Sequence, residues 1–206
     1  MCARVYDCLK CIGGRIIENS DFLTDLDREI GDADHGENMA RGYRAAIEKV
    51  SRDNPDIGAV LKQTGMTLLS TVGGASGPLY GTAYLEAAKV LSGKDTLTEE
   101  SFRDALGAAV AGIQKRGRST KGEKTMLDAL IPALEAYTQK ISDGGSLADG
   151  LDCACAAARE GVEYTRTIAA TKGRASYLGE RSIGHQDPGA TSAAITLEAI
   201  RDFIKG

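Results

Sequence analysis

The sequence contains no tryptophan and only three phenylalanines in 206 residues, and no long apolar run. A membrane-spanning helix needs about 20 consecutive apolar residues, and a secretory signal needs a basic segment followed by an apolar one. Because both patterns are missing, the sequence predicts a cytoplasmic protein with no membrane partner. Aromatic residues and alternating β-branched residues, which are typical of strands, are also scarce, so a β-rich fold is excluded.

The charge and the cysteines exclude two further classes of protein. The formal net charge is −4, and the basic run from Lys115 to Arg118 is short, so no nucleic-acid partner is expected. Five cysteines are an odd number. Cys8 and Cys11 form a C-x-x-C, but they lie in an apolar helical pattern without a second pair at zinc-ligand spacing. Buried free thiols are the favoured interpretation, and a redox pair is the alternative.

Apolar residues recur with the 3.6-residue spacing of amphipathic helices along the whole chain. Together with capping and breaking residues, this spacing predicts helices over about 5–16, 20–30, 36–50, 57–72, 78–92, 98–116, 124–142, 146–171 and 188–205. Thr98 and Ser146 are the expected N-caps of two of them. The sequence therefore predicts an all-α, up-and-down antiparallel bundle, and a single domain over residues 1–206 because no linker or repeat divides it.

The long polar connections between these helices are rich in glycine. They are Gly31–Gly36, Gly73–Gly81, Gly117–Lys124 and Gly173–Gly189. In an up-and-down bundle alternate connections share an end, so several of these segments are expected to meet at one rim.

The first connection carries three closely spaced carboxylates, Asp27, Asp32 and Asp34. Such a group repels itself unless a hard cation neutralises it, and Mg²⁺ prefers oxygen ligands. An EF-hand is excluded because no glutamate stands at the twelfth loop position, and the absence of an adjacent histidine pair argues against zinc. His35 and Asn38 follow at a helix start, where backbone N–H groups attract phosphate. A solvated acidic turn is the alternative.

The second connection, TVGGASGPLYGT, is built of small residues that let a backbone approach an anion closely. Ser76 offers a hydroxyl, and Pro78 is suited to a helix start. The chain has no G-x-x-x-x-G-K-[ST], so it is not a P-loop protein. An ordinary helix–helix turn is the alternative, although four glycines exceed what a turn needs.

The third and fourth connections add polar groups. In GEKTMLD, Thr125 is placed to meet a phosphate and Met126 to lie against a purine, whereas Asp128 is better interpreted as a cap. Arg174 and Arg181 in the fourth connection are candidate phosphate clamps. A connection of this length in a bundle is typical of a functional lid.

Taken together, GDADHGENMARG, GGASGPLYGT, GEKTMLDALIPA and GRASYLGERSIGHQDPGA resemble, in this order, the nucleotide-binding L component of dihydroxyacetone kinases. The resemblance covers essentially the whole chain. It implies an eight-helix barrel that holds ADP or ATP through two Mg²⁺ ions at one rim. It implies that Asp27, Asp32 and Asp34 ligate the metal ions and that Arg174 assists catalysis. The implied nucleotide contacts are His35, Gly36, Asn38, Ala75, Ser76, Gly117, Thr125, Met126, Arg174, Asp187, Pro188 and Gly189.

Two residues depart from the family pattern. Ala33 stands where glycine is usual, and it requires a negative φ to be free of strain. Glu123 replaces the usual aspartate and keeps its charge.

The resemblance also implies partners. A lone L chain is expected to work with a separate K subunit that holds dihydroxyacetone, and with a phosphohistidine-carrying M subunit of the phosphotransferase system as phosphoryl donor. Two alternatives stay open. One is an ATP-dependent kinase subunit for another small ketose, and the other is a nucleotide-state sensor that binds a transcription regulator.

Overall fold

The computed structural model describes residues 2–54 and 56–206, with side chains from residue 5 onward. Within these ranges it contains nine α-helices, one 3-10 helix and no β-strand, which confirms the predicted all-α class. The α-helices are α1 (Cys2–Glu18), α2 (Ser20–Ile30), α3 (His35–Lys49), α4 (Ile57–Thr71), α5 (Ser76–Val90), α6 (Glu99–Gly117), α7 (Leu127–Ser142), α8 (Leu147–Thr165) and α9 (Pro188–Lys205). The 3-10 helix η1 spans Arg174–Ser182.

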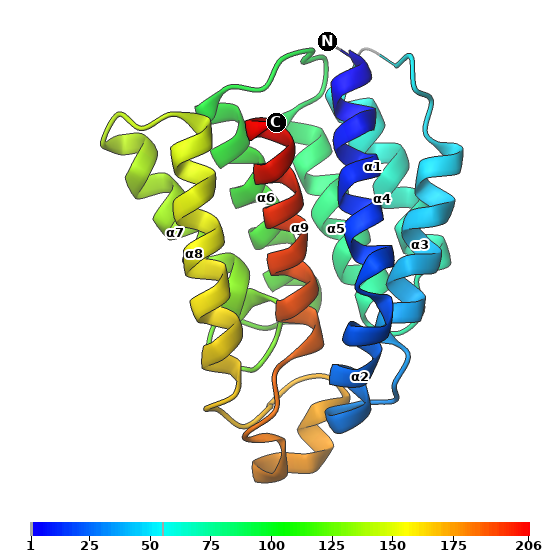
Figure 1. The fold of residues 1–206 in the computed structure, drawn as a ribbon, viewed down its shortest axis with the longest axis vertical. Helices are drawn as coiled ribbons and strands as arrows, with labels where there is room; N and C mark the ends of the chain where they lie inside the picture. Colours follow the sequence, from blue (N-terminus) through cyan, green and yellow to red (C-terminus); the bar gives the residue numbers. More distant parts are fainter. Residues whose placement is uncertain (1, 55) are drawn as a thin grey trace.

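The helices alternate in direction and close into a barrel (Figure 1). Only Asn19 separates α1 from α2, and α2 continues the course of α1, so the α-helices form eight antiparallel rods. Each rod packs against the next one along the chain, and α9 packs against both α8 and α1. This closed arrangement agrees with the expected eight-membered barrel.

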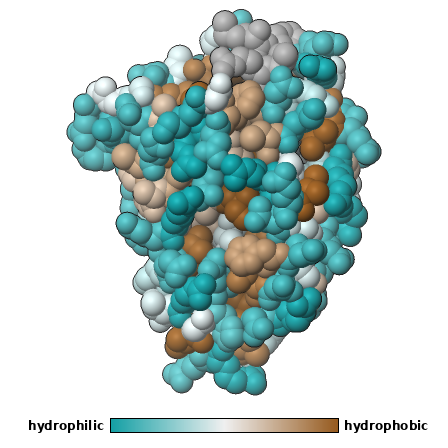
Figure 2. Space-filling model, in the orientation of Figure 1, coloured by the Kyte–Doolittle hydropathy of each residue, from teal (hydrophilic) through white to brown (hydrophobic). Residues whose placement is uncertain are grey.

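The core lies inside this ring. Its largest buried side chains include Leu23, Met39, Leu68, Leu127 and Leu151, each 0% exposed. The face seen in Figure 2 is mainly hydrophilic, with hydrophobic residues in small separate patches. Within the described residues, every helix is too short or too polar to span a bilayer.

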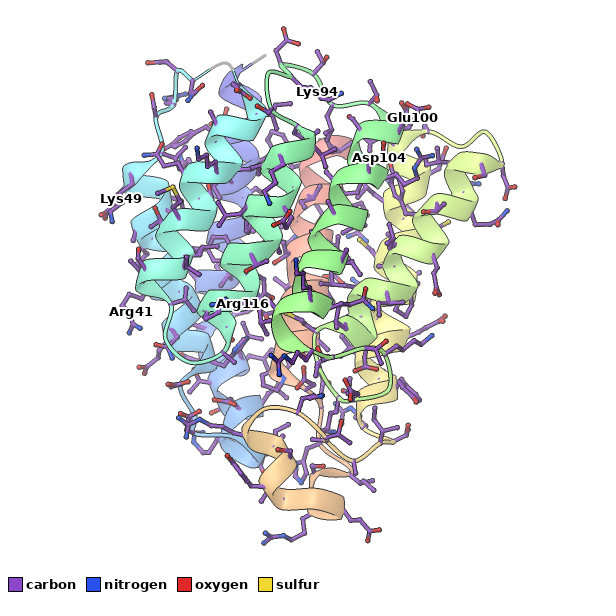
Figure 3. All side chains as sticks on the ribbon, turned by 180° about the vertical axis from the view of Figure 1, so that it is seen from behind. Arg41, Lys49, Lys94, Glu100, Asp104 and Arg116 are labelled. Carbon is purple, nitrogen blue, oxygen red and sulfur yellow. The ribbon has the colours of Figure 1, made fainter. Side chains whose placement is uncertain are left out.

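The interior also contains an apolar cavity of about 470 Å³. Tyr80, Ile113 and Met126 line this cavity and also a second one at the lower end of the barrel in Figure 1. These side chains therefore form the floor between the barrel interior and the rim. α6 runs the length of the barrel, with Glu100 and Asp104 at one end and Arg116 beside the rim (Figure 3).

Local sequence explains the helix ends that were predicted correctly. Thr98 and Ser101 exchange hydrogen bonds between side chain and backbone at the start of α6, and Ser146 and Asp149 do the same at α8. These capping boxes satisfy backbone N–H groups that have no partner inside the helix. The polar side chain of Asn19 behaves differently, because it donates to the Arg15 carbonyl and does not cap α2.

Two predicted helix boundaries and one predicted connection are wrong. α7 begins at Leu127 and not at Lys124, because Asp128 accepts hydrogen bonds from the backbone N–H groups of Gly122 and Thr125 and holds a turn there. α8 ends at Thr165, six positions before the predicted end at Thr171. The segment 173–189, predicted without regular structure, contains η1.

The environment of Cys8 and Cys11 favours free thiols over a redox pair. Cys8 lines the interior cavity, and burial raises the pKa of its thiol to about 12, with a further contribution from Cys11. The Cys11 thiol lies 3.6 Å from the Ala199 carbonyl oxygen. A thiol with such a raised pKa is a poor nucleophile, so a redox role for this pair is disfavoured.

Gly161 is required where α8 crosses α7. A Cβ added there would overlap the carbonyl oxygen of Asp128, whereas a Cβ on Gly107 of α6 meets nothing within 4 Å. Gly161→Ala is expected to lower the free energy of unfolding by about 1–3 kcal/mol through overpacking. Gly107→Ala, the matched control, is expected to raise it by up to about 1 kcal/mol through helix propensity. Urea unfolding measures both, and equal effects would contradict the packing argument.

Candidate functional site

All four glycine-rich connections lie at the same end of the barrel, as expected. Residues 31–34, 72–75, 118–126 and 166–187 link helices at the lower end in Figure 1. Together with the adjoining helix ends they enclose a cavity of about 360 Å³. This volume lies within the range of small-molecule sites.

The acidic group lies on one wall of this cavity. Asp27 belongs to the last turn of α2 and is 8% exposed, while Asp32 and Asp34 lie in the following turn. Each of the three carboxylates offers an oxygen within 4.8 Å of those of the others. The Asp27 Oδ2 atom accepts hydrogen bonds from the backbone N–H groups of Asp34 at 2.9 Å and His35 at 3.2 Å. One carboxylate oxygen therefore caps α3 from outside that helix.

The turn that holds these carboxylates is tight and strained. A Cβ on Gly31 would overlap Asp27 Oδ1, so a larger residue there would displace the carboxylate. Ala33 adopts φ 59°. The expectation that Ala33 needs a negative φ is thus not met, and its left-handed backbone costs about 1–2 kcal/mol relative to ordinary conformations. Glycine would adopt such a φ without that cost.

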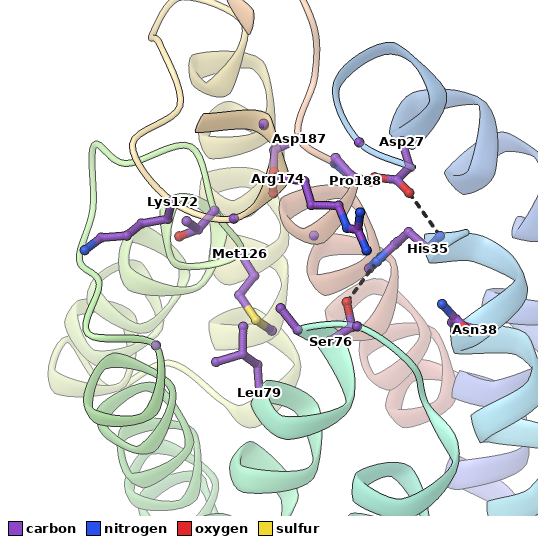
Figure 4. A pocket seen from close by; sticks show the side chains of 18 of the residues that line it. Asp27, His35, Asn38, Ser76, Leu79, Met126, Lys172, Arg174, Asp187 and Pro188 are labelled. Atoms are coloured by element: carbon purple, nitrogen blue, oxygen red, sulfur yellow. Dashed lines mark hydrogen bonds between the residues drawn. The ribbon is translucent and has the colours of Figure 1, made fainter. Parts of the chain in front are cut away.

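His35 connects three helices at the cavity wall, and Figure 4 shows its contact with Ser76. Its Nδ1 atom lies 3.0 Å from Ser76 Oγ at the start of α5, and its Nε2 atom lies 2.9 Å from Ser192 Oγ in α9. Burial lowers the pKa of His35, and the nearby Asp27 and Asp34 carboxylates partly oppose this effect. His35 is 7% exposed, and each of its ring nitrogens has a serine hydroxyl as its partner.

The second connection forms the next wall. Ala75, Ser76 and Gly74 line the cavity at the N-terminal end of α5, where backbone N–H groups and the helix dipole favour an anion. Asn38 lies beside them, 6% exposed, and its Oδ1 atom accepts from Arg41 Nη2. The amide N–H₂ group of Asn38 offers donors for an anionic ligand in the cavity.

The opposite wall is more apolar. Met126 is 4% exposed at the N-cap of α7, and Leu79 of α5 lies next to it in Figure 4. Gly117, the last residue of α6, and Thr125 complete this wall. Flat aromatic ligands bind to surfaces of this kind, because a methionine thioether packs well against a ring.

Lys124 holds two of the connections together. Its side chain is 1% exposed, its φ is 59°, and its ammonium donates to the backbone carbonyls of Thr165 and His185. A buried ammonium needs such acceptors, and burial lowers the pKa of Lys124 while the neighbouring Asp187 carboxylate raises it. The ammonium thus fixes residues 118–126 against the end of α8 and the segment before α9.

Asp187 caps α9, and its Oδ2 atom accepts from the Ala190 N–H at 2.7 Å. Pro188 and Gly189 follow in the first turn of α9 and also line the cavity. Burial raises the pKa of Asp187 to about 7 despite the hydrogen bond from Ala190, which acts in the opposite direction.

Arg174 is the first residue of η1 and reaches over the cavity, where its guanidinium lies 2.9 Å from an Asp32 carboxylate oxygen. Lys172 lies 3.6 Å from Glu123, whose carboxylate also accepts from the Thr120 N–H at 2.8 Å. The glutamate that replaces the family's aspartate therefore links two connections.

The structure brings together fourteen of the fifteen residues expected at the site. They are Asp27, Asp32, Asp34, His35, Asn38, Ala75, Ser76, Gly117, Thr125, Met126, Arg174, Asp187, Pro188 and Gly189. Gly36 is the exception, because it packs against α2, where a Cβ would overlap the Ser20 carbonyl oxygen. The candidate clamp Arg181 is exposed and does not line the cavity.

Sequence reasoning missed Lys124, Tyr80 and Ser192. No motif distinguishes a buried lysine from a solvated one, and Tyr80 and Ser192 belong to helices whose apolar pattern predicts only core. Arg116 and Lys172 also line the cavity. They stand at the ends of predicted elements, where boundaries decide which way a side chain points.

The residues present fit a hard divalent cation and a phosphate. The three carboxylates supply only oxygen donors, which Mg²⁺ prefers. The helix start at Ser76 and the amide of Asn38 supply donors for an anion. The apolar wall around Met126 suits a base.

A family model described as the DAK2 domain matches residues 29–202. The chain belongs to the DAK2 family. It is 47% identical over 182 residues to the "PEP-dependent dihydroxyacetone kinase, ADP-binding subunit DhaL" of Escherichia coli (strain K12), which covers 88% of this chain and 87% of that protein. It is 40% identical to the "PTS-dependent dihydroxyacetone kinase, ADP-binding subunit DhaL" of Lactococcus lactis, over 92% of this chain and 91% of that protein.

Solved structures share the fold of this DAK2 chain. The dihydroxyacetone kinase of C. freundii in complex with AMP-PNP and Mg²⁺ superposes with a TM-score of 0.73 at 23% identity. The match covers 96% of this chain and 33% of that one. The similarity confirms the helical barrel.

The raised pKa of Asp187 makes stability depend on pH. Because its folded pKa of about 7 exceeds its ordinary value of 3.8, the folded state favours the proton, and stability falls as pH rises through 7. Wild type is expected to lose about 2–3 kcal/mol between pH 5 and 8 relative to Asp187→Asn.

Asp149→Asn is the matched control for Asp187→Asn. Hydrogen bonds from Ser146 lower the pKa of Asp149, so this carboxyl is ionised in both states throughout that range. Its effect on stability is expected to be the same at pH 5 and pH 8. Denaturant unfolding in metal-free buffer measures both, and a constant difference for Asp187→Asn would contradict the burial argument.

Proposed function

We propose that this chain is the nucleotide-binding subunit of a dihydroxyacetone kinase and transfers a phosphoryl group through Mg²⁺-bound ADP or ATP. One observation carries the proposal. The three carboxylates, the start of α5 and Arg174 surround a single cavity of about 360 Å³. Oxygen ligands for Mg²⁺, donors for phosphate and a guanidinium are the components that phosphoryl transfer requires.

Asp27, Asp32 and Asp34 would hold the metal, and two Mg²⁺ ions are proposed from the resemblance to the family. When bound, Mg²⁺ neutralises charge on the phosphate oxygens. The backbone N–H groups at Ala75 and Ser76 orient the phosphates, and the amide of Asn38 adds a donor.

The base is proposed to lie between Met126, Leu79 and Gly117. The Arg174 guanidinium reaches the phosphate side from η1 and stabilises the negative charge of the transferring group. Asp187, Pro188 and Gly189 close the cavity at the start of α9. No residue of this chain is required as a nucleophile, because the acceptor hydroxyl belongs to the substrate.

The relatives' names support a proposal about partners. The E. coli and L. lactis relatives are ADP-binding subunits of PEP- or PTS-dependent kinases. We therefore propose that the 206 residues form one cytoplasmic domain. This domain would work with a dihydroxyacetone-binding K subunit and a phosphohistidine-carrying M subunit.

Reconstitution tests this assignment. The purified chain, a K subunit and dihydroxyacetone are combined with either ATP or the phosphorylated M subunit, and dihydroxyacetone phosphate is measured. Product formation with the M subunit, together with ADP retained in native mass spectrometry, is expected. Turnover with ATP alone, together with nucleotide that exchanges freely, would show that ATP and not the M subunit is the phosphoryl donor.

Another ketose is a second candidate substrate. The "L-erythrulose 1-kinase" of Mycolicibacterium smegmatis is 35% identical over 91% of this chain, which covers 33% of that protein. The same reconstitution with erythrulose separates the two substrates, because substrate choice would follow the K subunit. A nucleotide-state sensor that binds a transcription regulator is retained as a further role, and nucleotide-dependent co-purification of a regulator tests it.

The metal assignment is tested at Asp32. Asp32→Asn removes one negatively charged ligand and is expected to weaken Mg²⁺–ADP binding at least about tenfold. The loss of a residue that only holds a metal ligand in place already weakens metal binding by about that factor. Asp25→Asn is the matched control, because Asp25 is exposed on α2 and pairs with Arg28. Calorimetric titration measures both variants, and wild-type affinity in Asp32→Asn would exclude this carboxylate as a ligand.

The catalytic assignment is tested at Arg174. Arg174→Ala is expected to lower phosphoryl transfer about 10³-fold or more, as the loss of a transition-state arginine does in related chemistry. Arg181→Ala, from the same 3-10 helix but outside the cavity, is expected to keep wild-type turnover. Circular dichroism of both variants should match wild type. Equal turnover in the two variants would show that Arg174 has no role in transfer.

A further inference from the structure

A chain of buried hydroxyl groups stands behind His35. Ser192 in α9 is 0% exposed and lies 2.9 Å from His35 Nε2. The Tyr80 hydroxyl from α5, in a residue 4% exposed, lies 2.7 Å from Ser192 Oγ. On the other side of the ring, His35 Nδ1 faces Ser76 Oγ at 3.0 Å. Tyr80, Ser192, His35 and Ser76 therefore form a continuous series of hydrogen bonds, which ends at Ser76 on the cavity wall.

The hydrogen bonds of this series can be donated in either of two directions, toward Ser76 or away from it. Ser192 has one hydroxyl proton, and its acceptors include His35 Nε2 at 2.9 Å and the Gly189 carbonyl at 3.1 Å. The Gly189 carbonyl lies in the first turn of α9, where the backbone N–H four positions on is its regular partner. A carbonyl can accept two hydrogen bonds, so the Ser192 proton has two possible acceptors. When it goes to His35 Nε2, Tyr80 donates to Ser192.

The requirements of Ser76, at the cavity end of the series, decide the direction in which these hydrogen bonds are donated. Ser76 lines the cavity at the helix start where a phosphate is proposed to bind. Phosphate oxygens only accept hydrogen bonds, so Ser76 has to keep its proton for the ligand. It can do so only when His35 Nδ1 carries a hydrogen and donates to Ser76 Oγ. Hydrogen bonds aligned in one direction also strengthen one another in a buried site.

We infer that Tyr80 and Ser192 are positioning residues that hold His35 in the Nδ1–H tautomer, so that Ser76 donates to a phosphate of the bound nucleotide. This inference rests on the proposed function, because the anion fixes the direction of the chain. Neither residue touches the reacting atoms. Their effect reaches the ligand through the orientation of the His35 ring.

Nitrogen NMR tests the direction without any change in the site. The protein has two histidines, and His185→Gln leaves His35 as the sole imidazole. Long-range ¹H–¹⁵N spectra distinguish a protonated ring nitrogen from an unprotonated one. The protonated nitrogen is expected to be Nδ1, both in the free protein and with Mg²⁺–ADP. A protonated Nε2 with unprotonated Nδ1 in either state would overturn the inference.

Variants test the positioning. Ser192→Ala is expected to leave both tautomers populated and to weaken Mg²⁺–ADP binding about fivefold, the effect of one lost hydrogen bond. Tyr80→Phe is expected to do the same to a smaller extent. Tyr137→Phe is the control, because the buried Tyr137 hydroxyl donates to the Glu99 carbonyl and takes no part in these hydrogen bonds. Thermal unfolding of each variant shows whether the fold is kept.

The two levels of the account fail differently. If wild type does not bind Mg²⁺–ADP in calorimetry, the proposed function is wrong, and the spectrum of the free protein still tests the tautomer. If wild type binds Mg²⁺–ADP but Ser192→Ala binds equally well with one fixed tautomer, the positioning role is wrong and the proposed function stands.

Discussion

The structure depends on how the Asp27 carboxylate is shared. Its Oδ2 atom caps α3 through the N–H groups of Asp34 and His35, and the carboxylate stands within 4.8 Å of two others. The cap fixes where α3 begins. The same atom group concentrates negative charge at that point. Helix geometry and ligand chemistry are therefore set by one side chain, and a cation at this place would relieve the repulsion among the three acids.

The barrel gives this charge its context. Alternating helices bring every second connection to one end, so residues far apart in sequence surround one cavity. The apolar floor of Tyr80, Ile113 and Met126 separates that cavity from the interior. Lys124 and Glu123 fix two of the connections to each other, through the His185 carbonyl and the Lys172 ammonium, and Asp128 holds the turn that precedes α7. Since these links are made by buried or half-buried side chains, the rim is held without regular structure in most of its length.

Much of this organisation could be predicted from the sequence. Periodic apolar residues gave the helices, and the capping boxes at Thr98 and Ser146 were readable because a cap is a local interaction. The errors lie where distant contacts override local pattern. α7 starts late because Asp128 captures the preceding turn. Ala33 adopts a left-handed backbone because the Asp27 carboxylate and the start of α3 determine its turn.

Most residues that line the cavity could be named from the sequence, but the contacts that hold them in place could not. Ordered motifs identified the acids, the serine and the arginine. The burial of Lys124 and the pairing of Tyr80 with Ser192 depend on the packing of α5, α8 and α9, which no single segment encodes. Gly36 illustrates the reverse error, because its neighbours face the cavity while Gly36 itself faces α2.

The most direct test of the account is a calorimetric titration of the wild-type chain with ADP, in Mg²⁺ and again in EDTA. If the three acids bind nucleotide through the metal, ADP should bind tightly with Mg²⁺ and at least about a hundredfold more weakly without it, because bare carboxylates repel phosphate. Equal affinity in the two buffers would contradict the central claim that the acidic wall is a metal site.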